Sequence, residues 1–143
     1  MSDPYSRNLV NRNFYFNKVA IKARTVVVLD GMLENRELHL IKPISRVFPK
    51  GTIVELIGTD DNNASPGSIV NDIAYIGFFE LLNGGVMVAG DWIRWNGKTL
   101  GTIIGYDDTH MPNHQNVIVS MEKRIPGKLL GMHIEDEIII EGL

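Results

Sequence analysis

The sequence predicts an all-β protein of one domain, a small closed or partly open β-barrel with little helix. Short runs of β-branched and aromatic residues alternate with polar ones, and turn signals separate these runs at regular intervals. Single glycines also occur inside strand-like runs, which is typical of the bends at barrel corners. These glycines favour a barrel over the alternative, a β-sandwich.

Length and composition set the class of protein. The chain has 143 residues, 44% of them hydrophobic and 22% charged, which suits one domain with a core of its own. It has no cysteine, which excludes disulfides, cysteine-ligated metal centres and cysteine nucleophiles. No apolar run reaches the roughly 20 residues of a membrane span, and the first residues form no apolar leader. We therefore expect a cytoplasmic protein without a membrane partner.

The charge is small overall but unevenly distributed. A net charge of −3 argues against a nucleic-acid partner, which requires a basic face. Residues 1–50 hold nine basic and four acidic side chains, whereas residues 51–143 hold five and thirteen. One interpretation is that the basic part docks on an acidic surface of a neighbouring subunit in a homo-oligomer. The other is that ordinary surface charge happens to be skewed.

The first half of the chain begins with an irregular arm over residues 1–17, which carries an aromatic anchor, and the barrel-like domain follows over residues 18–143. The first predicted strand begins at Lys18, and its continuous apolar run 26–29 is typical of burial on both faces. Asp30-Gly31 is a hairpin-type turn signal. Further strands are predicted at 38–41 and 52–57, and a polar loop follows at 59–68.

Residues 69–82 fit two periodicities. Ile69, Ile73 and Ile76 have helical spacing, whereas residues 73–81 also alternate with a period of two. Their aromatic and β-branched content favours the strand.

The second half of the chain contains the clearest turn. A strand is predicted over residues 86–95, and Asn96-Gly97 then favours a hairpin because both central positions of a type I′ turn need positive φ. The return strand covers residues 99–106, and another follows at 117–121. Pro126-Gly127 predicts a type II turn. The last strand, 138–140, is flanked by acids that would protect a sheet edge.

The polar loop from Gly105 to Asn116 concentrates side chains suited to chemistry. It holds His110, His114, Asp107 and Asp108. As a catalytic set, one histidine would move a proton and one aspartate would fix its tautomer. As a metal site, His110 and His114 with Asp107 or Asp108 would bind a divalent metal as cofactor. Pro112 argues against the helix that would bring both histidines to one face.

The same loop has a simpler interpretation as a rigid turn, because Asp, Asn and Pro favour turns for backbone reasons. If the loop is a site, the predicted ligand-binding residues are Tyr106, Thr109, Asn113, Asn116, Trp92 and Arg94. Trp92 and Arg94 share a strand face and can stack at a pocket or subunit contact, although core packing also explains the tryptophan.

A second polar loop covers residues 60–65. It does not fit the EF-hand pattern, since Ser65 stands where that loop needs glycine. If both loops emerge at one end of the barrel, Asp60 and Asp61 would join His110 and His114.

The segment Gly105-Tyr106-Asp107 with Thr109-His110-Met111-Pro112-Asn113-His114 resembles that of an uncharacterised family of small β-rich bacterial and archaeal proteins. The resemblance covers roughly the last third of the chain and implies no activity. Two functions are predicted. The first is binding of a small polar ligand or metal at 105–116, with or without catalysis. The second is a non-catalytic structural subunit of a homo-oligomer, in which the loop is a rigid turn.

Overall fold

The structure is a computed structural model that describes residues 15–142. Its elements are β1 (Ile21–Val28), β2 (Met32–Leu33), β3 (Leu38–His39), β4 (Ser45–Phe48), β5 (Ile53–Thr59), β6 (Ile69–Val70), β7 (Ile73–Leu81), β8 (Gly85–Val88), β9 (Trp92–Trp95), β10 (Lys98–Asp107), β11 (Gln115–Ser120), α1 (Gly127–Leu130) and β12 (Glu137–Glu141).

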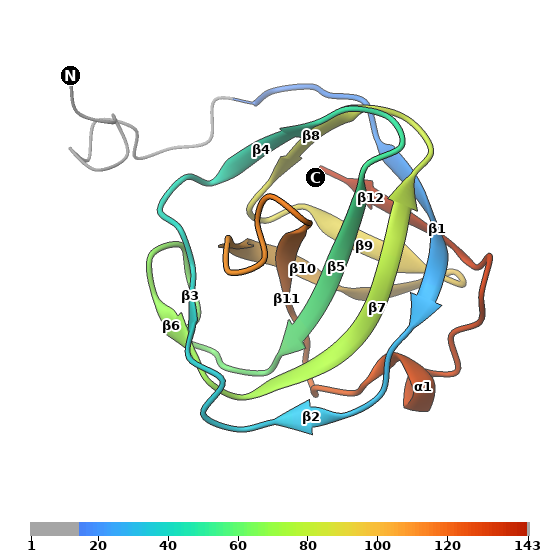
Figure 1. Cartoon of the computed structure of the whole chain (residues 1–143). Helices are drawn as coiled ribbons and strands as arrows, with labels where there is room; N and C mark the ends of the chain where they lie inside the picture. The colour runs from blue at the N-terminus through green and yellow to red at the C-terminus, as the bar shows by residue number, and fades with distance from the viewer. Residues whose placement is uncertain (1–14, 143) are drawn as a thin grey trace, which may run out of the picture.

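Within the described residues, seven strands close into a barrel, in the order β1-β12-β9-β10-β11-β5-β7. Closure results because β1 pairs with β12 on one side and with β7 on the other. β2 adds to β7 outside the closed ring. The predicted barrel is confirmed, and Figure 1 shows the strands wrapped around a common centre.

The pairing of β5 with β11 is parallel, whereas the other pairs of described strands are antiparallel. Gln115 lies opposite Val54 and Ser120 opposite Thr59. The loop that precedes β11 therefore lies at the start of β5, and the loop that follows β5 lies at the other end of the pair.

Two clusters of buried apolar residues among those described stabilise the wall of the barrel. The larger fills the barrel and includes Val54, Leu56, Val117 and Val119, because alternate residues of a strand face inward. The smaller lies on the outer face and joins residues of the wall to residues 38–40 and 69–70. Its members are Leu38, Leu40, Ile57, Val70, Ile73 and Ile118.

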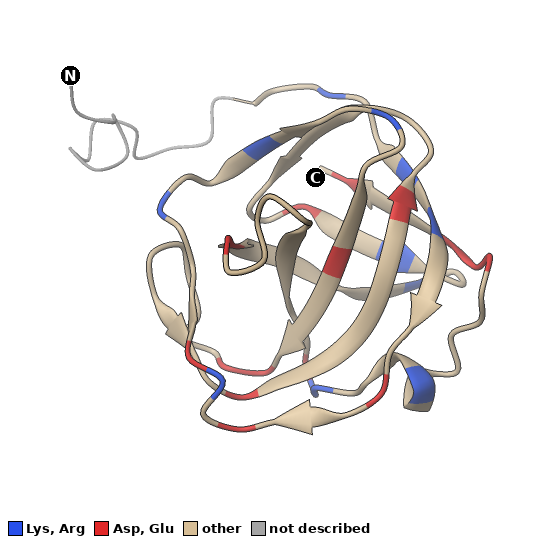
Figure 2. Cartoon of the chain, viewed as in Figure 1, with Lys and Arg blue, Asp and Glu red and all other residues tan. Residues whose placement is uncertain are grey.

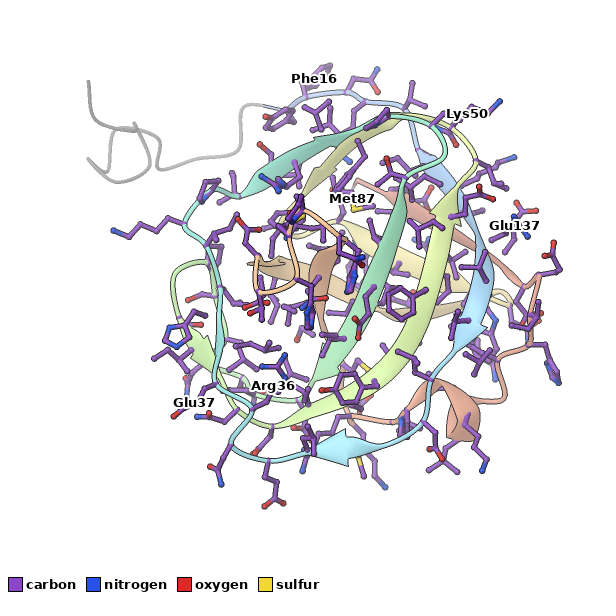
Figure 3. The ribbon with its side chains drawn as sticks, viewed as in Figure 1. Phe16, Arg36, Glu37, Lys50, Met87 and Glu137 are labelled. Carbon is purple, nitrogen blue, oxygen red and sulfur yellow. The ribbon has the colours of Figure 1, made fainter. Side chains whose placement is uncertain are left out.

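β4 and β8 form a separate two-stranded ribbon at the top of the view in Figure 1, with β2 and α1 at the bottom. Phe48 of β4 and Met87 of β8 belong to the interior cluster, so the ribbon covers one end of the barrel. Met87 is fully buried, and Figure 3 shows it near the middle of this end.

Glycines inside strands mark close contacts, as the sequence predicts. A Cβ on Gly101 would lie 2.1 Å from the carbonyl oxygen of Ser120, and one on Gly105 would lie 3.1 Å from Cδ1 of Leu40. Both glycines flank breaks in the strand register of β10.

Several predicted elements are confirmed. Residues 69–82 contain β6 and the whole of β7 and are not helical. Asn96 and Gly97 have φ of 52° and 73°, the positive values that the predicted hairpin turn requires between β9 and β10.

Other predictions are wrong. The predicted strand 86–95 is divided into β8 and β9, because the chain turns at Gly90 with φ of 101°. Pro126-Gly127 opens α1 instead of forming a type II turn. β12 lies between β1 and β9, so its acids do not protect a sheet edge.

The start of the chain needs two further corrections. Asp30-Gly31 forms no hairpin, because β1 and β2 run in the same direction along β7, with Val28 opposite Gly77 and Met32 opposite Ala74. The run 26–29 is only partly buried, with Val27 40% exposed.

The predicted arm lies outside the described residues up to residue 14. Next to it, Tyr15 Oη and Ser45 Oγ are 3.0 Å apart, and Phe16 is almost fully exposed. No helix among residues 15–142 is long and apolar enough to cross a membrane. Figure 2 shows basic and acidic segments interspersed around the barrel in this view.

Candidate ligand-binding site

A row of four residues in register crosses the outer face of the barrel beside the predicted loop. Asp107 of β10 lies opposite Asn116 of β11, Asn116 opposite Glu55 of β5, and Glu55 opposite Phe78 of β7. They face outward because their neighbours Tyr106, Val117, Leu56 and Phe79 belong to the interior cluster. The loop 108–114 joins the first two strands of this row.

Asp107 organises the start of the loop. It is 2% exposed, and Leu40 forms a bridge with it. Its Oδ1 accepts hydrogen bonds from the backbone N–H of Thr109 at 3.0 Å and from Nδ2 of Asn116 at 3.1 Å. The bond to the Thr109 N–H gives Asp107 the backbone role that the rigid-turn interpretation predicts, whereas the side chain of Thr109 makes no such bond among the described residues.

Gln115 closes the other end of the loop. Its Nε2 donates to the carbonyl oxygen of Asp107 at 2.8 Å and to Oδ1 of Asp108 at 2.7 Å. Nη2 of Arg46, on β4, lies 3.8 Å from the same oxygen of Asp108. Arg46, Asp108 and Gln115 thus meet where β4 passes the loop.

Two buried amide oxygens are left without a partner. Gln115 Oε1 and Asn116 Oδ1 have no hydrogen bond from any residue in the part of the chain described. Neither amide can be turned round to correct this, because each nitrogen donates to an oxygen of Asp107 or Asp108. Leaving such an acceptor buried and unpaired costs about 1–3 kcal/mol. An unpaired buried group of this kind points to an ordered water or a ligand.

Tyr106 contributes a third buried polar atom without a described partner, its hydroxyl. The residue is fully buried in the interior cluster, diagonal to Gln115, which shares the inward face of β11 with Val117. Burial raises the pKa of the Tyr106 hydroxyl far above its ordinary value, and the negative charge of Asp91 adds to the rise. The positive charge of Arg46 opposes it.

Both ring nitrogens of His114 are occupied by side chains. Nε2 lies 2.9 Å from Oε1 of Glu55, and Nδ1 lies 2.7 Å from Oδ1 of Asn113. Phe78 meets the ring edge-on, with centroids 5.0 Å apart. An imidazolium would donate to both oxygens, whereas a neutral ring needs the Asn113 amide rotated so that Nδ1 accepts. In either state no nitrogen remains for a substrate proton.

His110 stacks on His114, with ring centroids 5.0 Å apart and planes 27° apart. The loop therefore does bring the two predicted histidines together, although by a turn around Met111-Pro112 and not by a helix. His110 is exposed, and none of the residues described bonds its ring nitrogens.

The metal prediction gains no geometric support. Among residues 15–142, no three His, Asp or Glu side chains are placed to share one ion. Asp107 is turned to the loop backbone and Asn116, and Asp108 faces Gln115 and Arg46.

A cleft of about 610 Å³ lies between β4 with the turn after it and the second half of the loop. Its walls are Ser45, Arg46, Val47, Phe48, Pro49, Gly51, Thr52, Ile53, Met111, Pro112, Asn113, His114 and Gln115. Five consecutive residues from Ser45 line it, so β4 and the turn after it form one wall. The volume falls in the range of small-molecule sites. Figure 2 shows a basic segment on β4 beside this loop.

Other predicted residues lie elsewhere. Arg94 pairs with Glu141 on β12, and neither Arg94 nor Trp92 lines the cleft. Asp60 follows β5, at the other end of the parallel pair, where it lies 3.7 Å from Arg124. Asp60 therefore does not join the histidines.

Three residues of the site carried no signal in the sequence. Glu55 and Arg46 come from strands far from the loop in the chain, and only the register of β5 with β11 brings Glu55 to His114. Gln115 lies inside the predicted loop, but an amide has no spacing rule that distinguishes it from a turn residue.

Fold and site together define a closed β-barrel protein with a cleft of mixed polar and apolar lining at one end of its single parallel strand pair among the described strands. The chain belongs to the DUF6917 family, a family of unknown function, which matches residues 15–141. The predicted membership of an uncharacterised family is confirmed, over far more than the last third of the chain. No curated protein and no solved structure matches the chain.

Proposed function

We propose that this protein binds a small polar molecule in the cleft between β4 and the loop 108–114. The observation that carries the proposal is the Oε1 atom of Gln115, a cleft residue only 2% exposed whose acceptor has no described partner. Tyr106 and Asn116, on neighbouring positions of β10 and β11, also carry buried polar atoms without a described partner, although neither residue lines the cleft. A bound donor would remove the cost of leaving Gln115 Oε1 unpaired.

Binding is a better proposal than catalysis by the predicted set of His110, His114, Asp107 and Asp108. His114 has both nitrogens occupied, and Asp107 is committed to holding the loop. The role that this geometry favours for these residues is to fix the cleft wall, so that the unpaired acceptor is held in place before a ligand arrives.

The experiment is ligand-observed and protein-observed NMR with a library of small polar molecules. We expect at least one member to shift amide signals of residues 45–53 and 111–115 and to leave those of β9 and β12 unchanged. Gln115→Met, which keeps the volume but removes the acceptor together with the two hydrogen bonds that Nε2 donates to the loop, should lose this binding while its circular dichroism stays that of the wild type. A library without any such hit at millimolar concentration would contradict the proposal.

The second candidate function is that of an assembly subunit, and one observation favours it. Apolar side chains of Met32, Leu33 and Leu129 are 47–70% exposed on β2 and α1, away from the cleft. Exposed apolar groups on an edge strand can form a subunit contact. Light scattering on the purified protein tests this, and a strict monomer at high concentration would exclude the homo-oligomer.

A further inference from the structure

We infer that the ligand of this cleft is a small carboxylate whose α-carbon carries a hydrogen-bond donor, either a hydroxyl or an ammonium group. The inference rests on the proposed function and names the class of molecule. It comes from the donors and acceptors that the cleft leaves unused.

The guanidinium of Arg46 is an unused donor. Its side chain is 32% exposed, and it makes no hydrogen bond to any residue that the structure describes. Its ion pair with Asp108 is loose at 3.8 Å, because Oδ1 of Asp108 already accepts from Gln115 at 2.7 Å. A guanidinium in this state offers a fork of N–H groups that matches a carboxylate in two parallel hydrogen bonds.

The acceptor stands close to this donor. Arg46 Nη2 lies 3.8 Å and Gln115 Nε2 2.7 Å from the same oxygen of Asp108. The two nitrogens are therefore no farther apart than the sum of these distances. Gln115 Oε1 is bonded to the same amide carbon as Nε2. Because Arg46 and Gln115 line the same cleft, we assign to Gln115 Oε1 a donor one carbon away from the carboxylate that binds Arg46.

The other walls of the cleft accommodate an apolar group. Val47, Ile53 and Met111 line it and are 77%, 43% and 42% exposed. Branched aliphatic hydroxy acids and amino acids combine all three features, and their size suits a cleft of about 610 Å³.

Four matched probes separate the features of the ligand. Leucic acid and leucine have the carboxylate and the donor, isocaproic acid lacks the donor, and leucinol lacks the carboxylate. We expect leucic acid or leucine to bind at least about tenfold more tightly than isocaproic acid and leucinol, as loss of one charged or buried hydrogen bond implies. Titration calorimetry and NMR shifts of the cleft residues measure the affinities.

Variants assign the two contacts. Arg46→Met should weaken the binding of leucic acid at least about tenfold and leave the binding of leucinol unchanged. Gln115→Met should remove the preference for leucic acid over isocaproic acid. Lys50→Met is the matched control, since Lys50 is an exposed cation next to the cleft that does not line it and points away from the barrel in Figure 3. It should bind all probes like the wild type.

The outcomes also distinguish this inference from the proposed function. If library members bind in the cleft but leucic acid and leucine bind no better than leucinol, or if Arg46→Met changes nothing, the carboxylate class is wrong and the cleft is still a binding site. If neither the probes nor the library shifts the cleft residues, both are wrong. A crystal structure with one ordered water on Gln115 Oε1 and no probe bound after soaking would also overturn the inference.

Discussion

At the scale of single residues, two buried carboxylates fix the direction of several polar groups around the loop. Asp107 holds Asn116 and the backbone N–H of Thr109, and Glu55 holds His114. Sequence reasoning found most of this loop, because Asp, Asn and Pro have local preferences. It missed Glu55 because the contact with His114 spans 59 positions and depends on strand register.

The stacked histidines provide a test of this arrangement, because only one of them is anchored. We expect His114→Ala to lower the free energy of unfolding by about 1–3 kcal/mol, since Glu55, 5% exposed, loses its partner. The exposed His110 makes no such bond, so His110→Ala should change it by less than about 0.5 kcal/mol. Urea unfolding measures both, and equal effects would show that the contact between His114 and Glu55 contributes nothing.

At the scale of elements, the sequence predicted a local turn but did not predict which strands pair. Asn96-Gly97 has the positive φ values that its sequence predicts, because the conformation of this turn depends on these two residues alone. The position of β12 between β1 and β9, in contrast, depends on closure of the whole sheet. Nothing in the run Ile138-Ile139-Ile140 distinguishes a central strand from an edge strand.

Two glycines of β10 test the close contacts inside the wall. A Cβ at Gly101 would meet the backbone oxygen of Ser120, so that Gly101→Ala should cost about 1–3 kcal/mol of unfolding free energy. Gly105→Ala is the matched control in the same strand, because the only tight contact of its Cβ would be with Cδ1 of Leu40, the end of a side chain that can move. It should cost clearly less. If thermal and urea unfolding give similar losses of stability for the two variants, the strand propensity of alanine, and not the close contact, determines both losses.

At the scale of the whole molecule, three polar side chains gather at one end of the barrel. Tyr106, Gln115 and Arg46 lie where the β4–β8 ribbon covers the barrel. Alternation along the strands predicted an interior and an exterior, but it did not predict which end would be capped. The cap depends on the pairing of β4 with β8, from Phe48 with Gly85 (37 positions apart) to Ser45 with Val88 (43 positions apart), which carries no short-range signal.

The buried Tyr106 hydroxyl makes the stability of the whole barrel sensitive to alkali. Its pKa is raised in the folded protein, whereas the unfolded chain loses the same proton near pH 10. Above about pH 10 the folded state therefore binds one more proton than the unfolded state, and stability falls as pH rises, by up to about 1.4 kcal/mol per pH unit. Below that pH the contribution is complete and constant.

Tyr106→Phe should remove this loss while every other titrating group stays the same. Urea unfolding of both proteins between pH 8 and about pH 11 gives the two curves, which we expect to diverge only above about pH 10. At neutral pH the variant should also be more stable by about 1 kcal/mol, because an unpaired buried hydroxyl has been removed. Parallel curves, together with a variant that is less stable at neutral pH, would mean that the hydroxyl has a bound partner in solution. We would then look for that partner at the end of the barrel that holds Gln115, because the side chains of Tyr106 and Gln115 both face the barrel interior.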